Sequence, residues 1–139
     1  MHKITDNRQV ELSVFLIRQL RVFIAQQLPK APRLLEAATS VNMSERTLQR
    51  LLQFNNTSFR LLINECRHEL AKQYLLQADC SLQQIAFQLG FEEQSSFQKA
   101  FKTWQGCSPG VYRHRQLQAS RLNQYSVPRH GVQVNYGIN

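Results

Sequence analysis

Apolar residues recur three and four positions apart along most of the chain, which is the spacing of one helix face. One such stripe lies at 10–28 and is ended by Pro29 and Pro32. It carries Leu12, Phe15, Leu16, Leu20, Phe23 and Ile24 on one side, which predicts an amphipathic helix. The longest clean pattern, at 58–77, carries Phe59, Leu62, Ile63, Cys66, Leu70, Ala71 and Tyr74. Strand-like alternation is absent, so the pattern predicts an all-α fold.

Short polar segments mark where these helices begin and end. Ser44 is suited to be the N-cap of a helix that follows it, and Ser81 with Gln84 forms a capping-box pattern. Ser108 followed by Pro109 is typical of another helix start. The residues at 119–139 show no periodicity, and we expect this tail to be loosely ordered.

Residues 37–51 and 85–101 repeat one arrangement, with their first halves offset by 48 residues. Each copy has alanine in its first half, a residue suited to positive φ at a turn (Asn42 or Gly90), and apolar residues after the turn. This is the pattern of a helix-turn-helix. The alternative is ordinary helix packing with no reading function, but two copies flanking one long helix favour the helix-turn-helix.

The two copies and the long helix between them predict the layout of the chain. We expect a first helix-turn-helix subdomain at 1–57, a linker helix at 58–77, a second subdomain at 78–118 and the tail at 119–139. Twenty helical residues would span about 30 Å, so the linker helix has close to the length needed to place two reading helices one DNA turn apart. The sequence therefore predicts contact with successive major grooves by a monomer.

The second helix of a helix-turn-helix presents its first residues to base edges in the major groove. By pattern, the exposed residues at these positions are Arg46, Gln49, Arg50, Gln94, Ser95, Ser96 and Lys99. Arg suits guanine, Gln suits adenine, and short polar side chains allow close approach. The alternative for each set is a solvated helix face. The candidate phosphate contacts are Ser44, Arg60, Lys102, Ser108, Arg113 and Arg115.

Charge is unevenly distributed and strengthens this interpretation. The chain of 139 residues has a formal net charge of +8, and no Asp or Glu occurs from Gln94 to Asn139. A basic half indicates a polyanionic partner such as nucleic acid, although a basic surface also serves solubility.

Other functional classes find little support in the sequence. The three cysteines and four histidines lack metal-ligand spacing, so we expect no metal and no cofactor, and we expect reduced thiols in the cytoplasm. No paired carboxylates or Ser-His-Asp arrangement is visible, and Cys66 lies on an apolar stripe, so we expect no enzyme. Neither a membrane span nor a small-molecule site is evident.

Three segments together resemble the DNA-binding domain of the AraC/XylS family of bacterial transcription regulators. They are MSERTLQRLL, SFRLLINECRHELAKQYLL and SLQQIAFQLGFEEQSSFQKAFKTWQGCSPGVYR. The resemblance covers about residues 10 to 116. It implies seven helices and two helix-turn-helix subdomains that activate or repress promoters. The family's reading positions fall on the seven residues already named.

Two departures and one open alternative remain. Asn42 and Asn56 stand where Gly is common in the family, but both can adopt positive φ at modest cost. The chain has no room for the separate N-terminal domain of most members, so we expect a stand-alone regulator or a fragment, located at the nucleoid. The alternative function is a module that docks RNA polymerase or another regulator and binds DNA weakly.

Overall fold

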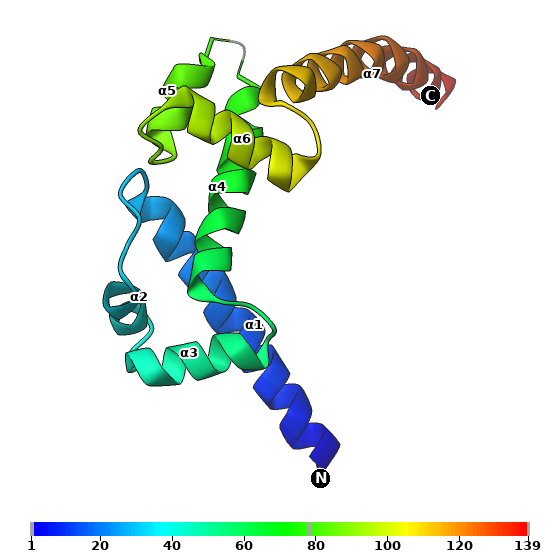
Figure 1. The fold of residues 1–139 in the computed structure, drawn as a ribbon. Coiled ribbons are helices and arrows are strands. Elements are labelled where there is room, and N and C mark those ends of the chain that lie inside the picture. The colour runs from blue at the N-terminus through cyan, green and yellow to red at the C-terminus, as the bar shows by residue number, and fades with distance from the viewer. Residues whose placement is uncertain (1, 78, 139) are drawn as a thin grey trace.

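The chain folds into helices joined by short turns. The computed structural model describes the backbone of residues 2–77 and 79–138, and the side chains of residues 7–77 and 79–124. Within that part it contains seven helices and no strand, which confirms the all-α class. Figure 1 shows an elongated arrangement in which α4 runs through the centre, with α2 and α3 beside its first half and α5 and α6 at its other end.

The first helices pack around one apolar cluster. They are α1 (His2–Gln27), α2 (Leu34–Ser40) and α3 (Glu45–Phe54). The cluster combines these helices with the first half of α4, and its buried members are Leu20, Ile24, Ala37, Ala38, Leu48, Leu52, Leu62 and Cys66. A half-exposed ion pair between Arg21 and Glu65 (2.8 Å) also joins α1 to α4.

Caps and turns confirm several local predictions. The Ser44 hydroxyl accepts a hydrogen bond from the Thr47 amide at 3.1 Å, which caps α3. Asn42 and Asn56 adopt φ of 58° and 57°, so both turns tolerate asparagine in the left-handed region. At α2, the backbone amide of Arg33 donates to the Glu36 carboxylate (2.7 Å), and this bond is the main cause of a lowered pKa for that carboxyl.

The linker helix is α4 (Phe59–Leu75), slightly shorter than the predicted 58–77. Its 17 residues span about 25 Å. Ser58 caps its start by accepting from the Leu61 amide.

The last three helices surround a second cluster. They are α5 (Leu82–Gln88), α6 (Gln94–Gln105) and α7 (Pro109–Ile138). The buried members, which include two residues from the second half of α4, are Ala71, Leu75, Ile85, Ala86, Leu89, Phe97 and Phe101. The predicted capping box opens α5, with Ser81 and Gln84 exchanging hydrogen bonds of 2.9 and 3.1 Å. Gly90 makes the following turn at φ 93°.

The two terminal helices differ from the sequence prediction. α1 begins at His2 rather than near residue 10, and α7 continues to Ile138, well beyond the expected end near residue 118. Residues 119–124 are exposed and lack an apolar stripe, but they include Ala, Arg, Leu and Gln, which favour helix without tertiary packing. Periodicity therefore underestimates this helix. The side chains of 125–139 lie outside the described part.

Candidate nucleic-acid interface

The start of α3 presents an exposed polar surface. Arg46, Gln49 and Arg50 are all exposed, and within the described residues no hydrogen bond or ion pair engages their side chains. The face is held outward because Leu48 and Leu52, on the other side of the helix, are fully or almost fully buried. Three long polar side chains are thus displayed together, and their exposure agrees with the prediction.

The start of α6 is a second surface of the same kind. Ser95, Ser96 and Lys99 are exposed, while Gln94 is half-buried. Phe97 and Phe101 are fully buried and fix the opposite side of this helix in the second cluster. Four short or flexible polar side chains therefore line the exposed side of the first turns of α6.

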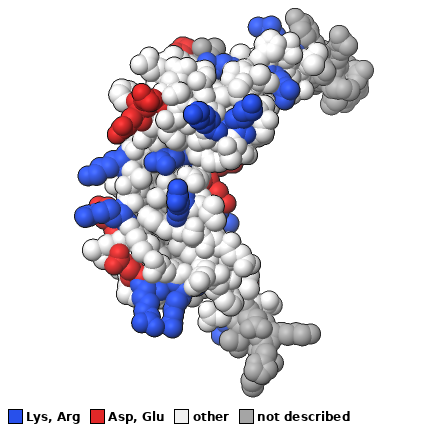
Figure 2. Space-filling view, viewed as in Figure 1, with Lys and Arg blue, Asp and Glu red and all other residues white. Residues whose placement is uncertain are grey.

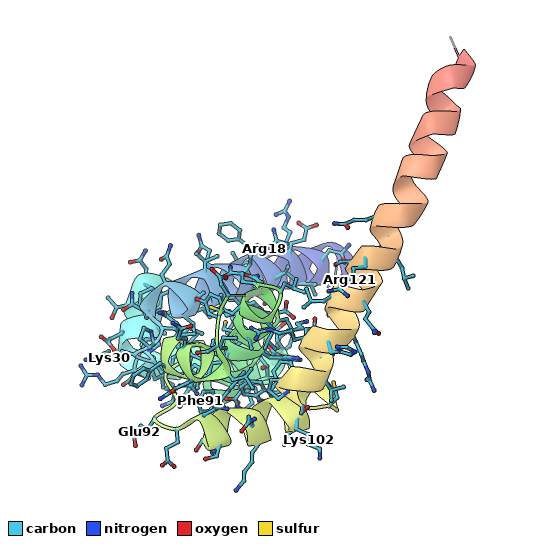
Figure 3. The ribbon with its side chains drawn as sticks, turned by 90° about the horizontal axis from the view of Figure 1, so that it is seen from above. Arg18, Lys30, Phe91, Glu92, Lys102 and Arg121 are labelled. Atoms are coloured by element: carbon cyan, nitrogen blue, oxygen red, sulfur yellow. The ribbon has the colours of Figure 1, made fainter. Side chains whose placement is uncertain are left out.

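Positive charge accompanies both helices on one face of the molecule. Figure 2 shows Lys and Arg side chains over α3, over α6 and between them. Lys102 lies on the outer side of α6, away from α1 (Figure 3). Positive charge distributed in this way could contact a polyanion that runs past the starts of both helices.

Most of the predicted phosphate contacts are available at the surface. Arg60, Lys102 and Arg115 are exposed and have no ion-pair partner among the described side chains. Ser44 and Ser108 each cap a helix, since the Ser108 hydroxyl accepts from the Val111 amide at 3.2 Å. Both serines therefore mark helix N-termini, where backbone amides favour an anion.

Arg113 is different from the other phosphate candidates. Its guanidinium donates to the carbonyl oxygens of Leu75 (2.8 Å), Gln77 (3.3 Å) and Cys80 (2.5 Å). These carbonyls lie at and just beyond the end of α4, where backbone acceptors lack helical partners. The geometry thus favours an intramolecular role, tying α7 to α4, over the phosphate contact expected from sequence.

Two carboxylates near the exposed start of α6 were not predicted as part of the site from the sequence. Glu92 and Glu93 are exposed immediately before α6, and Glu93 is its N-cap residue. Negative charge there stabilises the helix dipole but opposes a nearby phosphate. Two consecutive acidic residues just before the predicted second helix are a signal that the sequence carries.

Comparison with known proteins identifies the architecture. A family model described as a helix-turn-helix domain matches residues 37–115, more than half of the chain. The chain belongs to the AraC-type helix-turn-helix family.

Its relatives in this AraC-type family include named bacterial regulators. The chain is 38% identical over 82 residues to the ornithine utilization regulator of Pseudomonas aeruginosa, covering 59% of this chain and 24% of that protein. It is also 38% identical over 84 residues to an HTH-type transcriptional regulator of Mycobacterium tuberculosis, covering 60% of this chain and 24% of the relative. The matched segments thus span about a quarter of these relatives.

Solved structures share the AraC-type fold. A DNA-binding transcriptional dual regulator from Escherichia coli K-12 superposes with a TM-score of 0.70 at 25% identity, covering 74% of this chain and 93% of that one. The DNA-binding domain of AdpA, solved with a target DNA, has a TM-score of 0.58 at 23% identity over 71% of this chain and 90% of that one, a likeness of fold alone.

Cys66 is a core residue of this AraC-type chain. Cys66 is buried, its thiol lies 3.6 Å from the Arg21 carbonyl oxygen, and burial raises the pKa of that thiol. A raised pKa disfavours the nucleophilic thiolate, so Cys66 belongs to the core. The described side chains hold no cluster of three or more metal-ligating residues. No described helix is long and apolar enough to span a bilayer.

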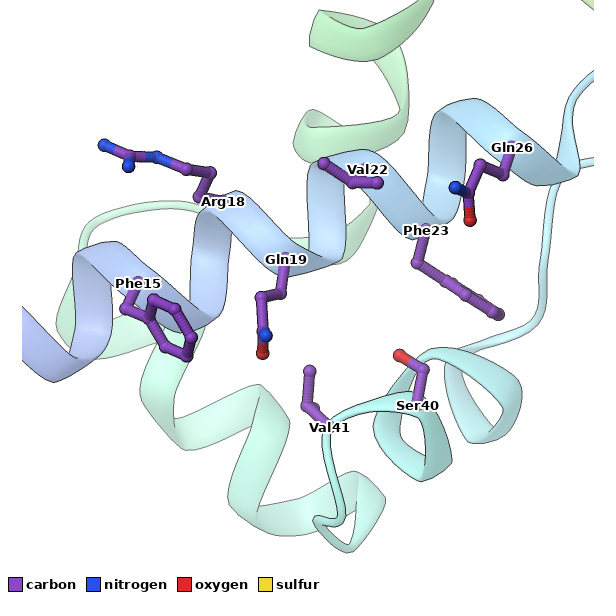
Figure 4. A pocket seen from close by; sticks show the side chains of 8 residues that line it. All are labelled: Phe15, Arg18, Gln19, Val22, Phe23, Gln26, Ser40 and Val41. Atoms are coloured by element: carbon purple, nitrogen blue, oxygen red, sulfur yellow. The ribbon is translucent and has the colours of Figure 1, made fainter.

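A cavity between α1 and α2 lies beside part of the apolar stripe of α1. The cavity has a volume of about 390 Å³, and Phe15, Val22, Phe23 and Val41 are among its walls (Figure 4). Phe15 is 53% exposed and Leu12 is 51% exposed, although both belong to the predicted apolar stripe. The stripe on α1 is wider than the surface that α2–α4 cover, so part of it faces this cavity or solvent.

Proposed function

We propose that this chain is a transcription regulator that binds double-stranded DNA sequence-specifically, with α3 and α6 in successive major grooves. One observation carries the proposal. Two helix-turn-helix units each expose polar side chains at the start of the second helix while burying its other side, and these side chains have no hydrogen-bond or ion-pair partner among the described residues. A helix in the major groove needs this arrangement.

The residue types at the two helix starts differ, and so does the recognition they support. On α3, Arg46 and Arg50 suit bidentate contact with guanine, and Gln49 suits adenine. On α6, Gln94, Ser95 and Ser96 permit close approach to the groove, and Lys99 adds a cation that can reach guanine or phosphate. We expect α3 to contribute more sequence discrimination than α6.

The length of α4 supports binding to successive grooves by one monomer. The helix spans about 25 Å, and α3 precedes its first residue while α6 packs on its second half. The candidate reading helices therefore lie at opposite ends of α4, and the proposal places them in major grooves about 34 Å apart, one turn of DNA. Phosphate contacts by Ser44, Arg60, Lys102, Ser108 and Arg115 would hold the register.

One observation supports the alternative function, docking of another protein. Several apolar residues of the first subdomain are exposed, and two of them, Val10 and Phe54, line one surface cavity. Exposed apolar patches are typical of protein contacts, so a surface that docks RNA polymerase or another regulator is the alternative or an additional role. In either role the protein would act in the cytoplasm at the nucleoid, and no cofactor is needed.

Selection from random duplexes tests the proposal. The protein is compared with an α3 variant (Arg46→Ala with Arg50→Ala), an α6 variant (Ser96→Ala with Lys99→Ala) and a control, Arg18→Ala, whose exposed side chain lies on α1. We expect two half-sites with centres about 10 base pairs apart, one lost with each reading-helix variant. Failure to enrich any sequence would contradict sequence-specific binding and favour the docking alternative.

A further inference from the structure

The two apolar clusters are separate, and α4 is the described helix that contributes buried residues to both. Leu62 and Cys66 belong to the first cluster, and Ala71 and Leu75 belong to the second. If α4 alone joined the clusters, a slight bend of this helix would move α6 relative to α3. Any further contact between the two halves therefore bears directly on how the reading helices are spaced.

Such a contact exists at the turn between α5 and α6. A Cβ added to Gly90 would overlap the carbonyl oxygen of Pro29 and lie 3.3 Å from its carbonyl carbon. Pro29 belongs to the α1–α2 connection, which approaches the α5–α6 turn in Figure 1. Backbone from the first half thus lies directly on backbone from the second.

Arg67, in the middle of α4, holds the same turn from another side. Its Nε donates to the Leu89 carbonyl oxygen at 2.9 Å, and its guanidinium carbon lies 5.3 Å from the centroid of the Phe91 ring. The residues before and after Gly90 are therefore both bound by one side chain. Burial lowers the pKa of this guanidinium, but arginine remains charged in proteins, so the charge-assisted bond and the cation–π contact persist.

The requirement for glycine at this turn goes beyond its backbone angle. Gly90 has φ 93°, but the corresponding turn of the first unit is made by Asn42 at φ 58°. Gly106 has almost the same angle, 89°, and an added Cβ there would meet nothing within 4 Å. At Gly90 alone of these three positions, a side chain would also separate the two halves of the molecule.

We propose that Pro29, Arg67 and Gly90 form a clamp that fixes α6 relative to α3 and thereby sets the spacing between the two half-sites. The inference rests on the proposed function, because it assumes that both helices read DNA. A rigid pair of reading helices binds the second half-site at high effective concentration only when the half-site spacing matches. A loosened pair loses this advantage at the best spacing and discriminates less between spacings.

A matched pair of glycine variants tests the clamp. Gly90→Ala and Gly106→Ala both place a side chain at a φ near 90°, but only the former meets Pro29. Each is titrated against duplexes whose two half-sites are offset in steps of one base pair, and against each half-site alone. We expect Gly90→Ala to lose about tenfold in affinity at the best spacing, to flatten the spacing profile and to keep its single half-site affinities. Gly106→Ala should keep the wild-type profile.

A second pair of variants tests the clamp at Arg67, its charged residue. Arg67→Met keeps an unbranched apolar chain beside Phe91 but removes the bond to Leu89, and Arg18→Met removes the same charge elsewhere. Figure 3 places Arg18 on the opposite side of the molecule from Phe91. Arg67→Met should flatten the spacing profile and Arg18→Met should not, which keeps the test informative if Gly90→Ala does not fold.

A distance measurement in the absence of DNA separates the clamp from the proposed function. Spin labels are attached at Gln53→Cys on α3 and Thr103→Cys on α6, in a background of Cys80→Ser and Cys107→Ser. The clamp predicts a narrow interlabel distance distribution that broadens or shifts in Gly90→Ala and Arg67→Met only. Identical distributions in all folded variants would overturn it. If the wild type binds no specific half-site, the proposed function fails and the spacing rule fails with it, whereas the distances still decide whether the clamp exists.

Discussion

Arg50 illustrates what a single exposed side chain on α3 is expected to contribute. Its guanidinium has no hydrogen-bond or ion-pair partner among the described residues, so binding DNA breaks no intramolecular bond. We predict that Arg50→Ala costs about 1 to 3 kcal/mol of specific binding and relaxes the preference at one base pair. Arg50→Lys keeps the charge but not the bidentate fork, so it should relax the preference with a smaller loss of affinity.

Titrations of both variants against specific and random duplexes measure the loss of affinity on each kind of DNA. An equal loss on the two kinds of DNA would show that Arg50 contacts only phosphate. Arg50 also lines a surface cavity beside Phe54 and Val10, so thermal unfolding of the variants serves as the control for a change in stability.

Arg113 and Arg115 are two residues apart on α7 and are expected to differ in role. Arg113 donates to three carbonyl oxygens near the end of α4, whereas Arg115 is exposed. We predict that Arg113→Met lowers the free energy of unfolding by about 2 to 3 kcal/mol, since it removes charge-assisted bonds to partly buried acceptors. Arg115→Met should leave stability unchanged and reduce the salt dependence of DNA binding by about one unit of slope.

Denaturant unfolding and salt titrations of the two variants distinguish these roles. A stable Arg113→Met protein with a reduced salt slope would restore Arg113 to the phosphate contacts.

Local features could be predicted from sequence at residue scale, but distant partners could not. The turn residues Asn42 and Gly90 and the capping pair Ser81 and Gln84 depend on neighbours within a few positions, and the structure confirms them. Arg113 bonds to carbonyls more than 30 residues away. No local pattern marks such a partner, so the sequence predicts a phosphate contact for a basic residue in a basic segment. The reading roles themselves remain predictions.

Phe97 packs α6 against the second cluster and so holds the opposite face of this helix toward solvent. Phe97 is fully buried, and its ring centroid lies 5.9 Å from those of both Phe91 and Phe101. We predict that Phe97→Ala lowers the free energy of unfolding by about 3 to 5 kcal/mol, through lost burial and the cavity left behind. Phe87→Ala on α5 is the matched control, since Phe87 is 67% exposed. Calorimetry of both variants checks this, and an unchanged melting temperature for Phe97→Ala would remove it from the core.

Prediction succeeded for helices whose ends are set by caps and turns, and it failed where no such signal exists. The start of α3 is set by its N-cap Ser44, and it matches the prediction. Residues 119–124 of α7 are exposed and carry no apolar period, so the pattern gave no indication that the helix continues there. The apolar stripe on α1 is only partly buried. Periodicity shows which face of a helix is apolar but not how much of that face other helices cover.

At the scale of the whole molecule, charge and shape act together. The net charge is +8, and the second half of the chain is free of acidic residues from Gln94 onward. Lys and Arg side chains extend over α3 and α6 on the face in Figure 2, with carboxylates near the start of α6. A long duplex laid across both helix starts would release counterions along its whole contact, whereas a docked protein would not.

Salt dependence therefore tests the whole surface in one measurement. Arg60, Lys102 and Arg115 at phosphates, with some contribution from Arg46, Arg50 and Lys99, predict a slope of log K against log salt of about −3 to −5. Fluorescence anisotropy with a labelled duplex, titrated at several concentrations of potassium chloride, gives this slope. Glu92→Gln with Glu93→Gln should tighten binding to random DNA by about a factor of two to three, because it removes exposed charges that oppose phosphate. A slope near zero for the wild-type protein would mean that this basic surface does not follow the DNA backbone, and the docking function would then be the better account of the fold.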